Sequence, residues 1–264
     1  MDLGLDGAVA VVTGASRGIG LAVTQALVVE GAHVVAGARV PGPDLEALAR
    51  AGKVHALAVD LGTADGPGRL AELALTELGR IDILVNNVGA VSPRPNGFLL
   101  VTDDDWTRSL TLNLLSAVRA TRAVLPTMVT AGRGSIVTIA SVNAILPDPG
   151  VIDYSAAKAA LVNFTKSVSK EFGPHGVRVN AINPGPVATD LWLGTGGVAE
   201  SVAATTGANP GAVAEEAATH AVTGRFTRPA EVANLAAFLS SERVAGNITG
   251  ATFAIDGGYA TETH

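Results

Sequence analysis

The sequence predicts an α/β fold in which helices cover both faces of a parallel, seven-stranded sheet. Short apolar runs rich in β-branched residues recur along the 264-residue chain and alternate with helix-like segments, as in βαβ units. Runs such as VAVV and IDILV are apolar on both sides of a strand, which fits strands buried between two layers of helices. The predicted strands span 8–13, 33–38, 54–59, 81–86, 134–140, 177–182 and 251–256.

Helix signals lie between these runs, at about 18–30, 66–79, 103–129, 154–172 and 229–240. The segment TDDDW at 102–106 places acidic residues in a first helical turn, and EFGPHG at 171–176 ends a helix with glycine and proline. A chain of 264 residues with 48% hydrophobic content can bury a large core, and we expect a single domain spanning 1–264.

The region 190–224, between the last two predicted strands, lacks such signals. It is rich in Gly, Ala and Thr and contains no Lys or Arg. Connections in compact domains are usually far shorter. We therefore expect an irregular insertion that forms a lid over a substrate.

Composition and charge argue against several classes of function. The net charge is −6 without a basic cluster, which disfavours nucleic acid or an anionic membrane as a partner. The chain has no cysteine, and its histidines (33, 55, 175, 220 and 264) show no metal-ligand spacing, so no metal site is expected. Neither a membrane span nor a signal peptide is recognisable, which leads us to expect a soluble, cytoplasmic protein.

The first predicted strand runs directly into TGASRGIG at 13–20, and helical sequence follows. Its glycines, Gly14, Gly18 and Gly20, form a G-x-x-x-G-x-G pattern. Such a turn exposes backbone N–H groups and aims a helix N-terminus at a pyrophosphate. Its place at the first strand-to-helix junction favours dinucleotide binding over a simple connecting turn.

The end of the second predicted strand indicates which dinucleotide binds. An acidic residue there would select the ribose of NAD, whereas a basic residue accommodates the 2′-phosphate of NADP. This strand ends in Ala38 and is followed by Arg39, and Arg17 lies in the glycine turn. Two guanidinium groups can clamp a phosphate. The sequence therefore favours NADP(H), the alternative being two solvated surface arginines.

Tyr154 and Lys158 stand four residues apart and share one helix face. The chain has only two tyrosines, the other being Tyr259, and four lysines, so a chance pair at this spacing is rare. An ammonium close to a tyrosine favours the phenolate and so lowers the pKa of the phenol. The pair therefore predicts a proton-transfer site, unless the helix merely turns both side chains outward.

Together these features resemble the short-chain dehydrogenase/reductase family over essentially the whole chain. The segments and residues that carry the resemblance are TGASRGIG at 13–20, Asp60, NNVG at 86–89, Asn113, Ser141, YSAAK at 154–158, NPGPVATD at 183–190 and DGG at 256–258. One departure is Val88, where the family usually has alanine. The resemblance implies a three-layer, doubly wound Rossmann fold with a seven-stranded parallel sheet, and a homotetramer built as a dimer of dimers.

The resemblance also implies a catalytic tetrad of Asn113, Ser141, Tyr154 and Lys158. Tyr154 would exchange a proton with the substrate oxygen. Lys158 and the positive charge of the oxidised nicotinamide would together lower the pKa of Tyr154, and Lys158 would also bind the nicotinamide ribose. Ser141 would donate to the substrate carbonyl. Asn113 would hold a water that connects Lys158 to solvent.

Further positions are implied as cofactor contacts, with Asp60 and Leu61 near the adenine and Asn87 and Gly89 near its ribose. Asp60 and Asn87 could instead serve only as caps or make strand-end hydrogen bonds. The implied cofactor-binding residues are Gly14, Ser16, Arg17, Gly18, Ile19, Gly20, Arg39, Asp60, Leu61, Asn87, Gly89, Tyr154, Lys158, Pro184, Gly185, Val187 and Thr189.

On the substrate side, Ser141 and Tyr154 would be joined by Leu191 and Trp192, which could equally well pack against helices. The sequence thus predicts hydride transfer between NADP(H) and a small neutral or apolar ketone or secondary alcohol. A 3-oxoacyl-[acyl-carrier-protein] reductase is the main competitor, although the lid offers no basic docking surface. An NADP-sensing protein without catalysis would not need the tetrad, and an isomerase or dehydratase is generally longer, so the sequence favours these functions less.

Overall fold

The structure, a computed structural model, describes residues 1–261 and contains a seven-stranded sheet with every strand parallel to its neighbours. The strand order is β3-β2-β1-β4-β5-β6-β7. The strands are β1 (Val9–Thr13), β2 (His33–Ala38), β3 (Val54–Ala58), β4 (Ile83–Asn86), β5 (Gly134–Ile139), β6 (Val177–Pro184) and β7 (Thr252–Ile255). The predicted doubly wound α/β fold is confirmed, and each predicted strand is present.

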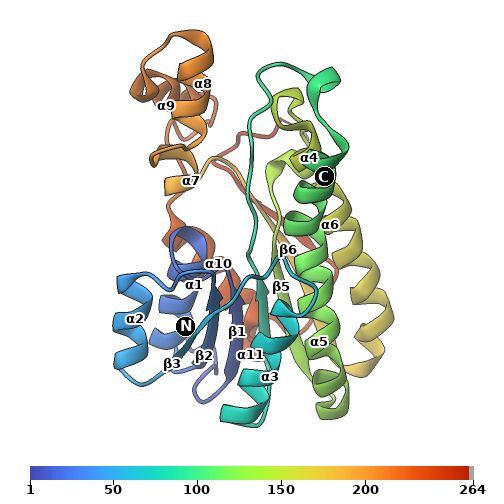
Figure 1. Ribbon diagram of the computed structural model, residues 1–264. Coiled ribbons are helices and arrows are strands. Elements are labelled where there is room, and N and C mark those ends of the chain that lie inside the picture. The colour runs from blue at the N-terminus through green and yellow to red at the C-terminus, as the bar shows by residue number, and fades with distance from the viewer. Residues whose placement is uncertain (262–264) are drawn as a thin grey trace.

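Helices cover both faces of this sheet (Figure 1). One face carries α1 (Gly18–Val29), α2 (Pro43–Arg50) and α10 (Pro229–Ser240). The other carries α3 (Gly66–Leu78), α5 (Ser116–Ala131) and α6 (Ile152–Phe172). The remaining helical segments are η1 (Phe98–Leu100), α4 (Asp103–Leu110), η2 (Thr111–Leu115), η3 (Val142–Ala144), η4 (Pro149–Val151), η5 (Gly173–His175), α7 (Asp190–Leu193), α8 (Val198–Thr206), α9 (Pro210–Thr219) and α11 (Glu242–Ala245).

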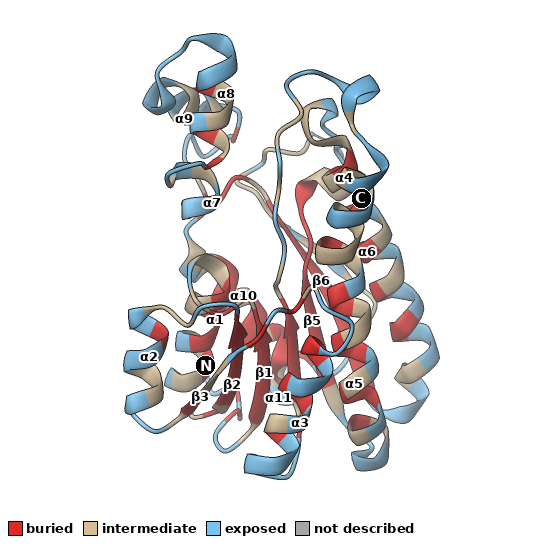
Figure 2. Cartoon of the chain, in the orientation of Figure 1, coloured by how far each residue is buried: buried red, intermediate tan, exposed pale blue. Residues whose placement is uncertain are grey.

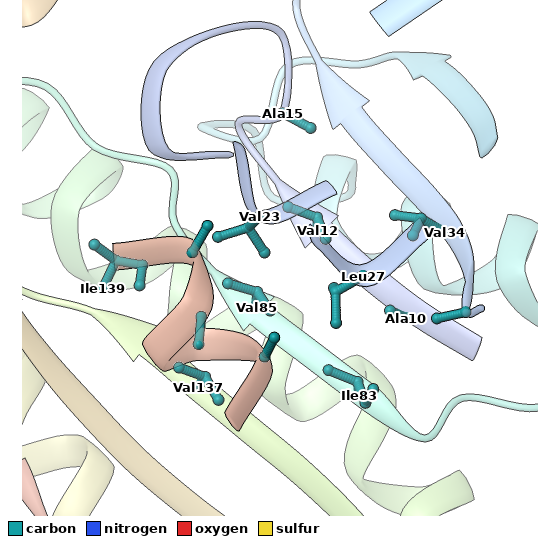
Figure 3. Close-up of a cluster of buried hydrophobic side chains, with 14 of the residues drawn as sticks. Ala10, Val12, Ala15, Val23, Leu27, Val34, Ile83, Val85, Val137 and Ile139 are labelled. Carbon is teal, nitrogen blue, oxygen red and sulfur yellow. The ribbon is translucent and has the colours of Figure 1, made fainter. Parts of the chain in front are cut away.

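Two apolar cores result from the two-residue period of the strands. Along β1, Val12 faces the core under α1 and α10, whereas Val11 faces the core under α3 and α5. In the first core, Val23 and Leu27 of α1 lie over strand residues that include Val12 and Val85 (Figure 3). The strands are accordingly buried on both sides (Figure 2).

The region 190–224 differs from the prediction, because it is mostly helical instead of irregular. It forms α7, α8 and α9, and α8 and α9 project beyond the sheet (Figure 1). Alanine is the strongest helix former, so this segment becomes helical without the apolar periodicity that marks a buried helix. Asn209 caps α9 by accepting from the Gly211 N–H at 2.8 Å.

Two further differences concern helices. The sequence did not predict α2, although Pro43 at its start and the acids Asp44 and Glu46 are helix N-terminal signals. The single helix predicted at 103–129 is instead α4, a π-helical turn η2 and α5. The π-helical turn widens the helix where Asn113 lies.

The sheet topology places a crevice at the carboxyl ends of the strands. β1 lies between β2 and β4, so the chain reverses its direction of winding between β1 and β4. Ligands of open α/β sheets bind at such a switch point. A cavity of about 970 Å³ lies there and is lined by Gly14 after β1 and Asn87 after β4. Within residues 1–261, no helix is long and apolar enough to cross a membrane.

Candidate active site

The glycine turn brings the start of α1 close to the end of β1. Gly14 and Gly18 have φ angles of +69° and +57°, a region that favours glycine. A Cβ on Gly20 would lie 2.2 Å from the Gly14 carbonyl oxygen and 2.5 Å from Asn87 Nδ2. Gly20 therefore permits close packing of the turn, and unlike Gly14 and Gly18 it does not line the cavity within the described chain.

The N-terminus of α1 is suited to bind an anion. Within residues 1–261, Arg17 at the N-cap makes no side-chain capping hydrogen bond, and the first turn holds no acidic residue. Ser16, Gly18 and Ile19 line the cavity beside this helix end. The partial positive charge of the helix dipole is therefore available to the cavity, which fits the pyrophosphate of a dinucleotide.

The same cavity extends from the glycine turn to the predicted catalytic residues. All predicted cofactor-binding residues except Gly20 line it. Ser141, Leu191 and Trp192 of the predicted substrate side line it as well. The structure thus brings segments from the two halves of the sequence to one continuous space.

Tyr154 and Lys158 lie on one face of α6, and Lys158 Nζ is 5.6 Å from the centroid of the Tyr154 ring. Lys158 is 3% exposed, and its Nζ donates to the Ile139 carbonyl at 2.9 Å. Burial lowers the pKa of Lys158 to about 8. Burial also raises the pKa of Tyr154, which the hydrogen bond with Ser141 partly offsets. The predicted lowering of the pKa of Tyr154 by Lys158 is therefore not found among the described residues.

Ser141 follows β5 and is oriented by Asn143. Its Oγ donates to Asn143 Oδ1 at 3.1 Å and accepts from the Asn143 N–H at 3.2 Å. Both residues line the cavity, and Ser141 is 7% exposed. Asn143 is a cavity residue that the sequence patterns did not reveal, because its only signal is its position two residues after Ser141.

Asn113 lies behind the cavity wall and does not line the cavity formed by the described residues. Its Oδ1 accepts from the Ala90 N–H at 3.0 Å, and its Nδ2 donates to the Ala90 carbonyl at 2.9 Å. A Cβ on Gly89 would be 2.9 Å from Asn113 Oδ1 and 3.4 Å from Lys158 Nζ. Asn113 therefore faces Lys158 across a glycine, and its role in holding a water stays a prediction.

Asp60 and Asn87 make hydrogen bonds to backbone groups near the ends of their strands. Asp60 Oδ1 accepts from the Gly62 N–H at 2.9 Å. Asn87 Nδ2 donates to the carbonyls of Thr13 at 2.9 Å and Gly14 at 3.0 Å. Because both residues also line the cavity, these bonds orient them there and leave a cofactor contact compatible with the structure.

The two predicted phosphate-binding arginines are exposed at the cavity edge. Arg17 Nη1 lies 3.5 Å from Asp190 Oδ2, with side chains 72% and 62% exposed. Arg39 lines the cavity and makes no ion pair within residues 1–261. Both guanidinium groups are therefore accessible to an anionic ligand.

The segment 190–224 contributes Trp192 to the cavity wall, and the Trp192 ring also packs against another aromatic side chain. Its ring centroid is 5.3 Å from that of Phe226, and it contributes to the cavity wall together with Leu191. Trp192 therefore combines a packing role with a place in the cavity wall. Tyr259 also lines the cavity, although only its scarcity in the sequence could have drawn attention to it.

Close packing explains the pairing of the PGP and DGG segments. A Cβ on Gly185 would lie 2.8 Å from the Cβ of Asp256. The lack of a side chain at Gly185 therefore lets this segment pack closely against Asp256, and Pro184, Gly185, Val187 and Thr189 line the cavity. Within residues 1–261, no group of three metal-ligating side chains gathers; His264 lies outside the described residues.

Comparison with known proteins assigns the chain to a family. The family model described as short chain dehydrogenase matches residues 8–195. The chain belongs to the short-chain dehydrogenase/reductase family. A 3-oxoacyl-[acyl-carrier-protein] reductase of Synechocystis sp. is 36% identical over 95% of this chain and 96% of the relative.

Two solved structures of family members extend this comparison. L-sorbose reductase from Gluconobacter frateurii, complexed with NADPH and L-sorbose, is 36% identical with a TM-score of 0.91, covering 100% of both chains. A putative NAD(P)-dependent gluconate 5-dehydrogenase from Beutenbergia cavernae with bound NADP is 32% identical with a TM-score of 0.86, covering 99% of this chain and 100% of the other. The protein is therefore an oxidoreductase that acts on CH–OH or keto groups with a nicotinamide dinucleotide.

Proposed function

We propose that the protein is an NADP(H)-dependent reductase of small neutral or apolar ketones, or the corresponding alcohol dehydrogenase. The observation that carries this proposal is the single cavity that joins the glycine turn to Ser141, Tyr154 and Lys158. A cofactor lying along the turn would have its reactive ring beside the tyrosine. The substrate would occupy the part of the cavity walled by Leu191 and Trp192, under the proposed lid.

The side chains divide the work of the reaction. Bound nicotinamide supplies the hydride and, once oxidised, a positive charge. The Ser141 hydroxyl would turn its proton from Asn143 Oδ1 to the carbonyl oxygen as negative charge develops there, while its Oγ still accepts from the Asn143 N–H. Tyr154 donates the proton to this oxygen, and its raised pKa keeps it protonated and ready to donate in the direction of reduction. Lys158, with a pKa of about 8, can exchange a proton near neutral pH.

The preference for NADP(H) rests on Arg17 and Arg39. Both are exposed arginines at the cavity, and the strand β2 supplies no acidic residue at its end to bind a ribose. The ion pair between Arg17 and Asp190 is long, at 3.5 Å, and both side chains are exposed. A phosphate can therefore replace Asp190 at little cost in free energy. The bound NADPH and NADP of the two related structures agree with this preference.

A 3-oxoacyl-[acyl-carrier-protein] reductase is the second candidate, favoured by the relative from Synechocystis sp.. The charges of the proposed lid speak against it. The lid bears the acids Asp190, Glu200, Glu215 and Glu216 and no Lys or Arg. An acidic carrier would meet charge of its own sign there, which disfavours docking.

A panel of ketones, alcohols and an acetoacetyl thioester, run in parallel with NADPH/NADP and NADH/NAD, tests both candidates. The proposal predicts the highest kcat/KM for a small neutral ketone with NADPH. An acetoacetyl thioester reduced as fast as the best ketone would favour the second candidate. A preference for NADH would contradict the roles of Arg17 and Arg39. The homotetramer, the single domain over 1–264 and the cytoplasmic location stay predictions.

A further inference from the structure

Arg94 is a largely buried side chain in a loop whose following residues are exposed. The loop between β4 and α4, which rises from the sheet in Figure 1, contains the sequence SPRP at 92–95, and residues 95–100 are all exposed. The side chain of Arg94 is only 16% exposed. The flanking prolines restrict the backbone before folding, so ordering this segment costs less entropy. The Arg94 N–H donates to the Gly150 carbonyl at 2.7 Å and fixes the loop against the segment before α6.

The guanidinium group of Arg94 binds carboxylates on two helices. Its Nε and Nη2 donate to Oδ1 and Oδ2 of Asp153 at 3.1 and 2.6 Å, a bidentate pair in the first turn of α6. Its Nη1 lies 3.1 Å from Oδ1 of Asp105 in the first turn of α4. Asp105 also closes the capping box of α4 with Thr102. Arg94 therefore ties the loop to the starts of both helices.

Asp153 depends on this pairing for its charge. It is 2% exposed, and burial alone would raise its pKa. The hydrogen bonds and the charge of Arg94 outweigh burial and hold the pKa of Asp153 below its usual range. Asp153 is therefore ionised at neutral pH. Loss of Arg94 would leave a buried carboxylate without its bidentate cation, a strongly unfavourable state.

The polar contacts of Asp153 continue to the catalytic tetrad. Asp153 immediately precedes Tyr154 on α6, and the Ser109 side chain helps to lower the pKa of the Asp153 carboxyl group. Ser109 lies one turn before Asn113, whose Nδ2 donates to the Ser109 carbonyl at 3.1 Å. The network thus reaches one member of the tetrad on α6 and another on the π-helical turn after α4.

The network closes on the loop that carries Arg94. Both polar atoms of the Asn113 amide bind the backbone of Ala90, four residues before Arg94. Val88, Gly89, Ala90 and Val91 of the same loop line the cavity. Arg94 itself does not line it within the described chain, so any effect it has on catalysis passes through the residues that it orients.

We infer that Arg94 is a positioning residue. Its bidentate pairing with Asp153 holds the β4–α4 loop, α4 and α6 in the arrangement that places Tyr154 at the cavity and Asn113 behind the cavity wall. This inference rests on the proposed function, because it takes Tyr154 to be the proton donor. It adds a residue outside the tetrad and outside the cavity wall to the machinery of the site.

A double-mutant cycle tests the inference, with Arg94→Met, Asp153→Asn and the double variant assayed for ketone reduction with NADPH. NADPH affinity is measured by fluorescence and folding by thermal unfolding. Arg94→Met should lower kcat about 30-fold, because small displacements of reacting groups are costly, while the Kd for NADPH changes less than about twofold. The double variant should keep a higher kcat than Arg94→Met, because it leaves no buried carboxylate unpaired.

Two further variants set the scale of the effect. Arg94→Lys retains the charge without the bidentate geometry and should lose about fivefold in kcat. Arg108→Ala is the matched control, because Arg108 contacts the same Asp105 at 3.6 Å but its side chain is 75% exposed. It should stay within about twofold of wild type.

Several outcomes would overturn the inference. One is a kcat for Arg94→Met within twofold of wild type. A second is that Arg94→Met loses as much affinity for NADPH as it loses in kcat. A third is that the fold loss in kcat of the double variant equals the product of the losses of Arg94→Met and Asp153→Asn. If Arg94→Met does not fold, Arg94→Lys and Asp153→Asn decide, and unchanged kcat in both overturns it. Activity retained in Tyr154→Phe would instead refute the proposed function, whatever Arg94 does.

Discussion

The two ends of the cavity are built in opposite ways. At the end proposed to be catalytic, Asn113 and Lys158 are 1% and 3% exposed and bind backbone groups. At the other end, the side chain of Arg17 is 72% exposed and has a 3.5 Å contact with Asp190. Buried hydrogen-bonded groups keep one geometry, whereas exposed ion pairs rearrange at little cost. Proton transfer needs groups that keep a fixed geometry, whereas recognition of a phosphate tolerates side chains that rearrange.

Among substitutions of the residues compared above, Lys158→Met should lower kcat the most. Met keeps the length of the side chain but removes the cation beside Tyr154. We expect kcat to fall about 10²- to 10³-fold, the range for loss of a group in acid–base catalysis. Steady-state reduction of a small ketone measures it. Lys166→Met on the same helix, where the exposed lysine donates to the Gly250 carbonyl, should leave kcat unchanged.

The same variant tests the burial of Lys158 through stability. The pKa of Lys158 is about 8 in the folded protein, below its unfolded value of about 10.4. Between these pH values the unfolded chain binds more protons, so the stability of the wild type rises with pH in this window. The Tm of the wild type relative to Lys158→Met should therefore rise from pH 8 to pH 10. A constant difference would show that Lys158 titrates normally.

Gly89→Ala tests how tightly the catalytic end is packed. The new Cβ would lie 2.9 Å from Asn113 Oδ1 and 3.4 Å from Lys158 Nζ, so one or both must move. We expect about a tenfold loss in kcat. Gly68→Ala in α3 is the control, because its Cβ would meet nothing within 4 Å and alanine favours the helix. Equal kcat values for the two variants would contradict the tight packing.

Arg39→Ala and Arg17→Ala test the exposed end. Each should raise the KM for NADPH about tenfold, the value of one charge-assisted hydrogen bond, and leave the KM for NADH nearly unchanged. The effect should shrink as salt is added, because exposed charges are screened. A loss in kcat with either cofactor would instead place these arginines in the chemical step.

Asp190→Asn should have the smallest effect. The pair with Arg17 is exposed, so its loss should change the free energy of unfolding by less than about 1 kcal/mol. Because Arg17 would lose a competing partner, the KM for NADPH should fall slightly. A rise in this KM would mean that Asp190 orients Arg17 for the phosphate.

The difference between the two ends also explains what could be predicted from the sequence. Strands such as VAVV, the glycine turn and the spacing of Tyr154 and Lys158 are local patterns, set by periodicity or by backbone conformation. The cavity confirms that these segments meet at one place. The helices α8 and α9 escaped prediction because alanine is the commonest residue in both, and the buried side of α8 consists of Ala199 and Ala203, which give only a weak apolar pattern.

The contacts between segments could not be read from local patterns. Asn113, in the π-helical turn, makes hydrogen bonds to Ala90, which is 23 residues away. The pairing of Arg94 with Asp153 spans 59 residues and joins a loop to a helix. The pKa of Tyr154 was expected to be lowered, yet burial raises it, because the depth of a side chain is a property of the fold.

The kcat of Tyr154→Phe tests the central claim most directly, because the substitution removes only the hydroxyl group that we propose as the proton donor. With NADPH and the best ketone of the panel, we predict a loss of at least about 10²-fold in kcat. The Kd for NADPH should stay within about twofold, because the glycine turn and the arginines are untouched. A variant that keeps more than a tenth of the wild-type kcat would show that Tyr154 is not the proton donor.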